Sequence, residues 1–236
     1  MSQTTEILSQ KDAYLRAFDA TVMVVRAEDR AVALDATAFY PGGGGQPADH
    51  GMLDGRRVVG LKRDGELVWH ELDGDPPASG ARVHGEIDWD RRHALMRTHT
   101  AFHILCGVVW RDWGAQVTGG NMEPLKGRMD FEFETLRQEL VHEIEEKVNA
   151  EVAAGRVIRV AFHSREDAFR IPDLIRTKIN LLPAGIQVVR TVEIVGLDLQ
   201  ADGGTHVANT GEVGRIRVAG YHSKGRLNKR IELVIG

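Results

Sequence analysis

Two histidines four positions apart, His99 and His103, are well placed in this sequence to bind a metal ion. They lie in HTAFH, a stretch with the pattern of a helix, where positions i and i+4 share one face. Asp202 and His206 form a second pair far downstream in DGGTH, whose two glycines permit a tight turn. Together the four side chains are enough to close a tetrahedral zinc site, or to leave one position for water.

Cys106 is a competing ligand, because positions 99, 103 and 106 lie on one helical face and a thiolate binds zinc well. Its neighbours are apolar, so a buried structural cysteine is the stronger expectation. The HExxH motif of zinc peptidases is absent at this point, since Thr100 stands where those enzymes place a glutamate. The pattern therefore favours a metal site and argues against a peptidase.

The chain has 236 residues, enough for one large or two small domains with a well-buried core. Its apolar runs are too short to span a bilayer, and its N-terminal segment lacks the basic region of a secretory signal. One cysteine allows no internal disulfide, which suits a reducing compartment. We expect a cytoplasmic protein with no membrane association.

Charge is distributed unevenly along the chain. The net charge of −4 argues against a strong, non-specific nucleic-acid binder. Residues 1–90 hold 9 basic and 16 acidic side chains, whereas residues 91–236 hold 21 and 18. The segment 215–230 holds six basic residues and no acidic one. A polyanion would meet the second half of the chain, although an ordinary solvated surface explains the same charges equally well.

The hydrophobic pattern changes near residue 90. Residues 1–90 contain short apolar alternations bounded by Gly, Asp and Pro, the pattern of a small β-barrel or sandwich. Helical periodicity then runs over about 90–112 and about 134–154. Strands are predicted at about 156–162 and 187–195, with a short helix in SREDAF and a Pro-marked turn in IPDLIRT between them, and two more strands close the sequence.

The sequence therefore predicts an α+β protein of two domains. The first, residues 1–90, is expected to be a small N-terminal β-barrel that carries a Gly-rich loop. The second, residues 91–236, is expected to combine an antiparallel sheet with two long helices and to hold the metal site.

Four stretches, in this order, carry a resemblance to one family: TAFYPGGGGQPADHG (37–51), RTHTAFHIL (97–105), GRMDFEFE (127–134) and GLDLQADGGTHVANTGEVG (196–214). They resemble the alanyl-tRNA editing proteins of the AlaX type, free-standing relatives of the editing domain of alanyl-tRNA synthetase. The Gly-rich stretch is similar to that of the medium-length class, in which a β-barrel precedes the editing domain. The similarity runs over most of residues 20–236.

The resemblance implies a trans-editing hydrolase that deacylates tRNA(Ala) wrongly charged with serine and, in some members, with glycine. It also implies one zinc ion per chain, held by HxxxH and CxxxH motifs that fall here on His99, His103, Asp202 and His206. Asp202 replaces the cysteine that is usual in the family. A carboxylate is a harder ligand than a thiolate and can hold zinc more loosely. Three histidines plus water, with Asp202 outside the coordination sphere, is an alternative.

Polar residues near these motifs are the candidates for contact with the substrate. Thr37, Gln46 and Thr100 are expected at the catalytic site, where they could hold a serine hydroxyl or a water; the alternative for the Gly-rich stretch is a purely structural turn. A metal-bound or metal-positioned water would attack the ester, without a covalent nucleophile. The expected contacts to tRNA phosphates are Arg128, Arg190, Lys224, Arg226, Lys229 and Arg230.

Two other functions are compatible with the sequence. One is a non-catalytic tRNA-binding module in which Asp202 marks a degenerate metal site. The other is a metallohydrolase of a small ester. The intact HxxxH and GGTH stretches favour the deacylase, whose expected partner is mischarged tRNA(Ala) and which shows no sign of an obligate protein partner.

Overall fold

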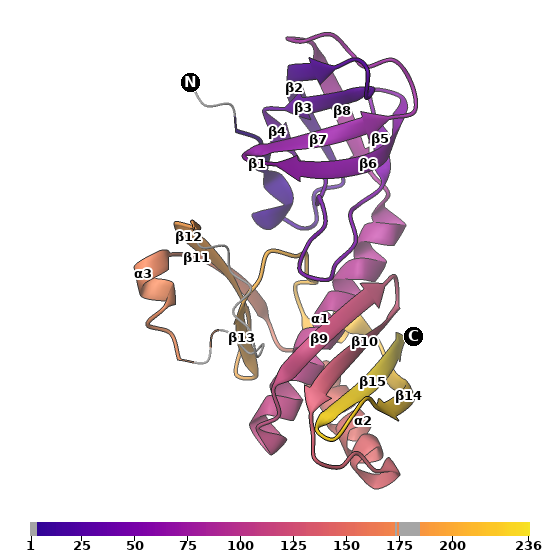
Figure 1. The fold of residues 1–236 in the computed structure, drawn as a ribbon, viewed down its shortest axis with the longest axis vertical. Coiled ribbons are helices and arrows are strands. Elements are labelled where there is room, and N and C mark those ends of the chain that lie inside the picture. Colours follow the sequence, from indigo (N-terminus) through magenta and orange to yellow (C-terminus); the bar gives the residue numbers. More distant parts are fainter. Residues whose placement is uncertain (1–3, 173, 175–184) are drawn as a thin grey trace. The chain divides into compact units, whose positions relative to one another are not determined.

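The computed structural model describes residues 4–172, 174 and 185–236 (Figure 1). The fold is α+β, with mostly antiparallel sheets and, among the described residues, three α-helices. The chain divides into two compact units, Met1–Ala94 and Leu95–Gly236. Within the described ranges, no helix combines the length and apolarity that a membrane crossing needs.

The first unit contains a closed barrel with the strand order β2-β3-β7-β6-β5-β8. Its strands are β2 (Ala17–Arg26), β3 (Ala31–Leu34), β5 (Gly51–Leu53), β6 (Arg56–Asp64), β7 (Leu67–Leu72) and β8 (Arg82–Ile87). Every second residue of β8 is buried, as expected for a strand with one face toward a core. Gly85 lies on this inner face. Its position requires a glycine, because a Cβ there would collide with the ring of Phe18. Phe18 in turn meets Phe39 edge to face, with ring centroids 5.6 Å apart.

The Gly-rich stretch follows a short parallel pair formed by β1 (Glu6–Ile7) and β4 (Ala36–Thr37). A single turn of 3-10 helix, η1 (Leu8–Gln10), follows β1. Gly43 and Gln46 exchange backbone hydrogen bonds of 3.0 and 2.9 Å, which closes a tight turn. The four glycines 42–45 all have positive φ, between 57° and 131°, so this backbone depends on residues without a Cβ.

A buried ion pair anchors the end of this stretch. Arg92 and Asp49 both have side chains with no solvent exposure, and the guanidinium donates to the carboxylate. Arg92 also donates to the main-chain oxygens of Ala13, at 2.9 Å, and Ala38, at 2.6 Å. This cation is therefore fully compensated inside the first unit.

The second unit combines two sheets with helices (Figure 1). The four-stranded sheet has the order β14-β15-β10-β9, and the three-stranded sheet has the order β11-β12-β13. The strands are β9 (Val117–Glu123), β10 (Lys126–Glu132), β11 (Ile158–Ser164), β12 (Val188–Ile194), β13 (Asp198–Ala201), β14 (Ile216–Ser223) and β15 (Asn228–Ile235). The helices are α1 (Trp89–Trp113), α2 (Gln138–Ala153), α3 (Arg165–Ala168) and the 3-10 turn η2 (Thr210–Val213). The first residues of α1, up to Ala94, belong to the first unit.

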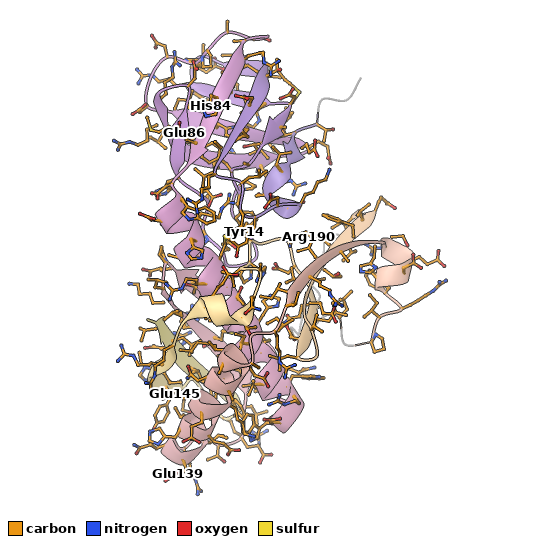
Figure 2. The ribbon with its side chains drawn as sticks, turned by 180° about the vertical axis from the view of Figure 1, so that it is seen from behind. Tyr14, His84, Glu86, Glu139, Glu145 and Arg190 are labelled. Atoms are coloured by element: carbon orange, nitrogen blue, oxygen red, sulfur yellow. The ribbon has the colours of Figure 1, made fainter. Side chains whose placement is uncertain are left out.

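Each long helix is tied to the four-stranded sheet by specific contacts. Phe102 of α1 packs where Gly120 and Gly127 leave space on β9 and β10, and a Cβ at Gly127 would come 2.5 Å from the Phe102 ring. On α2, Glu145 accepts from Val218 N at 2.7 Å, and Asn149 exchanges two hydrogen bonds with the backbone of Ile216 (Figure 2). The packing of Phe102 thus holds α1, which carries two of the predicted ligands, against the sheet of its unit.

The elements differ from the sequence prediction in two ways. α2 begins at Gln138 rather than near residue 134, because the backbone of its N-cap, Arg137, is still extended. The β9–β10 hairpin was not predicted, since its glycines and charged residues conceal the strand pattern. Of the Pro-marked turn predicted at 171–177, residues 173 and 175–177 lie outside the described part of the chain.

Candidate metal centre

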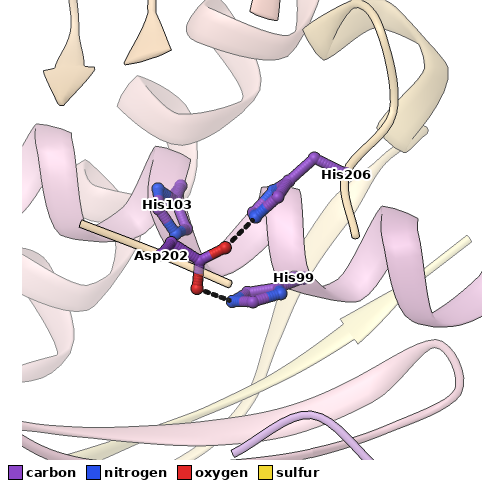
Figure 3. A group of neighbouring side chains, drawn as sticks. All are labelled: His99, His103, Asp202 and His206. Atoms are coloured by element: carbon purple, nitrogen blue, oxygen red, sulfur yellow. Dashed lines mark hydrogen bonds and ion pairs between the residues drawn. The ribbon is translucent and has the colours of Figure 1, made fainter. Parts of the chain in front are cut away.

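The structure brings the four predicted ligands, His99, His103, Asp202 and His206, into one cluster (Figure 3). Each contributes one possible ligand atom, and these atoms all lie within 4.8 Å of one another. The Asp202 carboxylate lies between two imidazoles: one oxygen is 3.4 Å from Nε2 of His99, and the other is 2.9 Å from Nε2 of His206. The four side chains come from α1 and from the segment that follows β13.

The DGGTH turn folds in the way that two glycines allow. Asp202 N donates to Arg190 O at 3.1 Å, which extends the β12–β13 pairing by one residue. Gly204 N then donates to the Asp202 carboxylate at 2.8 Å and reverses the chain. His206 is thereby returned to the same carboxylate. The turn thus aims both of its end residues at the helix that carries the other two.

Two residues outside the cluster hold the outer nitrogens of two imidazoles. Asp198, fully buried at the start of β13, accepts from Nδ1 of His103 at 3.0 Å and from Gln200 at 2.7 Å. The hydroxyl of Thr100 lies 3.2 Å from Nδ1 of His206. With the proton on Nδ1, the His103 ring keeps the lone pair of Nε2 for the centre of the cluster, as is usual for histidines that bind metals. Nε2 of His206 instead donates to the Asp202 carboxylate at 2.9 Å, and a bound metal ion would displace that proton.

Close contact between α1 and β13 depends on Gly107, one helical turn beyond His103. A Cβ at this position would come 2.8 Å from the Leu197 side chain and 3.0 Å from Cβ of Asp198. A larger residue would push the two elements apart. Gly107 therefore allows Asp198 to reach His103.

Arg190 of β12 supplies the nearest positive charge. Its side chain is 6% exposed, and its guanidinium donates to the main-chain oxygen of Asp202 at 2.8 Å (Figure 2). The same guanidinium lies 3.7 Å from the Asp202 carboxylate. Its charge offsets part of the cost of burying that carboxylate.

Burial and charge tune the cluster toward binding a cation. Burial lowers the pKa of His99 to about 4 and the pKa of His206 well below its usual value, and the neighbouring histidines add to both effects. Burial also lowers the pKa of His103, but the hydrogen bond to Asp198 and the negative charges of Asp198 and Asp202 together outweigh it, and the net shift is upward. Although burial raises the pKa of Asp202, the surrounding histidines hold it well below the usual range. Three imidazoles, two of them with lowered pKa values, beside an ionised carboxylate are a donor set that fits a divalent transition-metal ion.

The other predicted catalytic residues occupy buried positions. Thr100, on α1, accepts from Val207 N at 3.3 Å in addition to its contact with His206, so its hydroxyl is committed to the DGGTH segment. Thr37 and Gln46 lie in the first unit, where the Thr37 hydroxyl is 2.8 Å from Nε2 of His70 and Gln46 closes the Gly-rich turn. Cys106 is buried and stands outside the cluster of four.

The six predicted phosphate contacts divide into two groups. Lys224 and Arg226 are exposed in the β14–β15 loop, and Arg128 and Arg230 are partly exposed beside Asp130. Arg190 and Lys229 are buried instead. Arg190 serves the cluster, and the Lys229 ammonium donates to the main-chain oxygens of Gly225 and Arg226. The charge of a basic residue does not predict whether its side chain lies on the exposed or the buried face of a strand.

Sequence reasoning missed Asp198 and Gln200. The available signal was their position: residues 198, 200 and 202 alternate along one strand, so they share the face that carries Asp202. Recognising that signal required knowing that 198–201 is a strand, and this short segment gives only a weak strand pattern.

Comparisons with known proteins agree on one kind of relative. Residues 189–232 match the family described as the threonyl and alanyl tRNA synthetase second additional domain. The alanyl-tRNA editing protein AlaX-M of Saccharolobus solfataricus is 40% identical over 96% of this chain and 97% of its own length. The AlaX-M protein of Methanosarcina acetivorans is 38% identical with the same coverage. The alanine–tRNA ligase of Pyrobaculum neutrophilum is 37% identical over 91% of this chain, which corresponds to 25% of the ligase.

Proposed function

This chain belongs to the alanyl-tRNA editing proteins, and on that premise we propose that it is a zinc-dependent deacylase that hydrolyses Ser-tRNA(Ala) in trans. Gly-tRNA(Ala) is the second expected substrate. The observation that carries the proposal is the convergence of His99, His103, Asp202 and His206 in a buried cluster, in a chain similar over nearly its whole length to editing proteins. The work of such an enzyme places it in the cytoplasm with the translation machinery.

The cluster residues would hold the ion, and a bound zinc would supply a Lewis acid that polarises the ester carbonyl. His99, His103 and His206 each present a ring nitrogen, and Asp202 adds one negative charge. Asp198 and Thr100 fix the orientation of two of these rings, while Arg190 holds the backbone of Asp202. The chain's part is therefore to keep a preorganised, mostly dry site ready for a charged transition state.

Recognition of the rest of the substrate is assigned to other residues. Thr37 and Gln46 remain candidates for the serine hydroxyl on the strength of the family resemblance. We assign phosphate contacts to Arg128, Lys224, Arg226 and Arg230, whose side chains are at least partly exposed. Arg190 and Lys229 are left out of this set because their charged groups are buried.

Deacylation assays test the proposal directly. The protein is incubated with tRNA(Ala) charged with serine, glycine or alanine, and the assay is repeated with His103→Ala and with His142→Ala, a control at an exposed position of α2. We expect loss of Ser-tRNA(Ala) with Ala-tRNA(Ala) largely spared, no activity in His103→Ala, and full activity in the control. Equal activity in His103→Ala would remove the cluster from the mechanism.

Two further results separate the alternatives. A non-catalytic tRNA-binding module would bind tRNA(Ala) without hydrolysing the ester, whereas retention of one zinc through dialysis favours the enzyme. A small-ester hydrolase would cleave a free seryl ester as well as the charged tRNA. The buried, complete donor set favours the deacylase over a degenerate site.

The ligand role of Asp202 has its own test. Asp202→Cys restores the usual family ligand, so it should keep activity and bind zinc more tightly, because a thiolate is the softer donor. Zinc affinity is measured by competition with a chromophoric chelator. Complete loss of bound zinc in this variant would mean that Asp202 lies outside the coordination sphere.

A further inference from the structure

The three-stranded sheet presents one face to the metal cluster. Residues paired across antiparallel strands share a face, and so do alternate residues along a strand. Phe162 pairs with Arg190, and Val192 pairs with Gln200. Asp198 and Asp202 continue the same alternation along β13 and beyond it. The face that supplies Asp198 and Arg190 to the cluster therefore also carries Phe162, on the edge strand β11.

Around Phe162 this face is apolar and open to solvent. Phe162 is 48% exposed, Val160 beside it on β11 is 40% exposed, and Val188 at the start of β12 is 55% exposed. The opposite face of the same strands is covered: Val189 packs there with Ala168 and Leu174. An exposed aromatic ring thus lies directly beside Arg190, whose guanidinium contacts Asp202.

We propose that Phe162, flanked by Val160 and Val188, is the platform on which the terminal adenine of the acylated RNA stacks. The inference rests on the proposed function, because it takes the scissile ester to lie at the cluster. Phe162 is then two strands from Asp202, about 10 Å at the usual strand spacing. One nucleoside bridges a gap of that order between the ester and the base.

The chemistry of the patch suits a single unpaired base. Bases at RNA ends are recognised by stacking on aromatic side chains, and such stacking tolerates any base because each has a π face. Arg190 is held by Asp202 and is nearly buried, so it adds no phosphate contact at this place. Three side chains are also too small an area for a stable interface with a second copy of the chain. The patch therefore fits the end of the RNA better than it fits a protein partner.

Three variants test the platform. Phe162→Ala removes the ring, Phe162→Trp retains a larger one, and Phe169→Ala is a matched control at another exposed phenylalanine, which follows α3. From the usual cost of losing a stacked base, Phe162→Ala should lower kcat/KM on Ser-tRNA(Ala) between about 5- and 150-fold, mainly through KM. Phe162→Trp should restore it, Phe169→Ala should leave it unchanged, and all three should bind zinc with wild-type affinity.

A binding measurement isolates the base itself. Uncharged tRNA(Ala) with its 3′-terminal adenosine is compared with the same tRNA lacking that nucleotide. We expect the wild type to bind the complete tRNA more tightly and Phe162→Ala to lose the difference. The inference is overturned if Phe162→Ala keeps the difference, if Phe162→Trp fails to restore kcat/KM, or if Phe162→Ala converts a wild-type dimer into monomers.

The two proposals fail in different ways. If the proposed function is wrong, the wild type does not hydrolyse Ser-tRNA(Ala). If only the platform is wrong, the wild type hydrolyses it and Phe162→Ala does so equally well.

Discussion

The two units of this protein bury polar groups in opposite ways. In the first unit, Arg92 and Asp49 form a closed set, in which the buried guanidinium donates to the carboxylate and to two main-chain oxygens. In the second unit, possible ligand atoms of three imidazoles and a carboxylate converge within 4.8 Å of one another. Arg190 is near, but it only partly offsets the negative charge.

The difference distinguishes polar groups that are buried to hold the fold together from polar groups that are buried to bind a ligand. A buried charge that is fully paired inside the fold needs no ligand from solution, and removing its partner is strongly destabilising. A convergence of possible ligand atoms, in which two imidazoles and the carboxylate have lowered pKa values, makes a place where a cation would be stabilised. Mutation of the closed set should therefore change the free energy of unfolding. Mutation around the four convergent side chains of the second unit, the open set, should change the affinity for a metal ion.

Breaking the closed set should give the largest stability effect. Asp49→Ala leaves the Arg92 guanidinium buried without its counter-charge, which typically costs about 3–5 kcal/mol. The free energy of unfolding is measured in urea with and without zinc, and the loss should be the same in both. Asp54→Ala, at an exposed ion pair with Arg56, is the control and should cost less than about 1 kcal/mol. A loss at Asp49 that zinc restores would contradict the comparison.

The second prediction concerns His70, the buried partner of Thr37 in the first unit. Burial lowers its pKa to about 4, below the usual 6.5, so the unfolded state binds a proton first as the pH falls. Stability from the neutral His70 is thus complete above pH 6.5 and is lost progressively toward pH 4, by at most about 3 kcal/mol. Urea unfolding of the wild type and of His70→Gln across this range should show a steeper decline in the wild type. Parallel pH profiles would show that His70 does not titrate in this way.

The third prediction tests the support behind the open set. Asp198→Asn keeps an acceptor for His103 but removes the buried negative charge, so zinc affinity should fall about 10- to 100-fold with little change in zinc-free stability. Asp130→Asn, at another ion pair of the second unit, is the control and should leave zinc affinity unchanged. Unaltered zinc affinity in Asp198→Asn would reduce this contact to ordinary packing.

How far the sequence could predict these regions depends on whether the signal is local. The spacing of His99 and His103 on a helix, and the glycines between Asp202 and His206, are local patterns, and the structure brings those four residues together. The long helix α1 was predicted for the same reason, because its periodicity lies within one segment.

Signals that depend on strand pairing were out of reach. The local sequence does not show that β12 lies between β11 and β13. This strand order pairs Phe162 with Arg190, and Val192 with Gln200, across neighbouring strands. For the same reason, Arg190 was expected on the surface, although the fold buries it behind the cluster. The β9–β10 hairpin was not predicted because it contains Gly120 and Gly127, and glycine is uncommon in strands. These glycines make room for Phe102 of α1, a contact that the local sequence does not show.

Stepwise addition of zinc to metal-free protein tests the central claim most directly. Bound zinc and the rate of Ser-tRNA(Ala) hydrolysis are measured in the same samples. If the four convergent side chains hold the ion that hydrolysis needs, activity should rise in proportion to bound zinc and level off at one equivalent per chain. Full activity in the zinc-free protein, with no response to added zinc, would contradict the account.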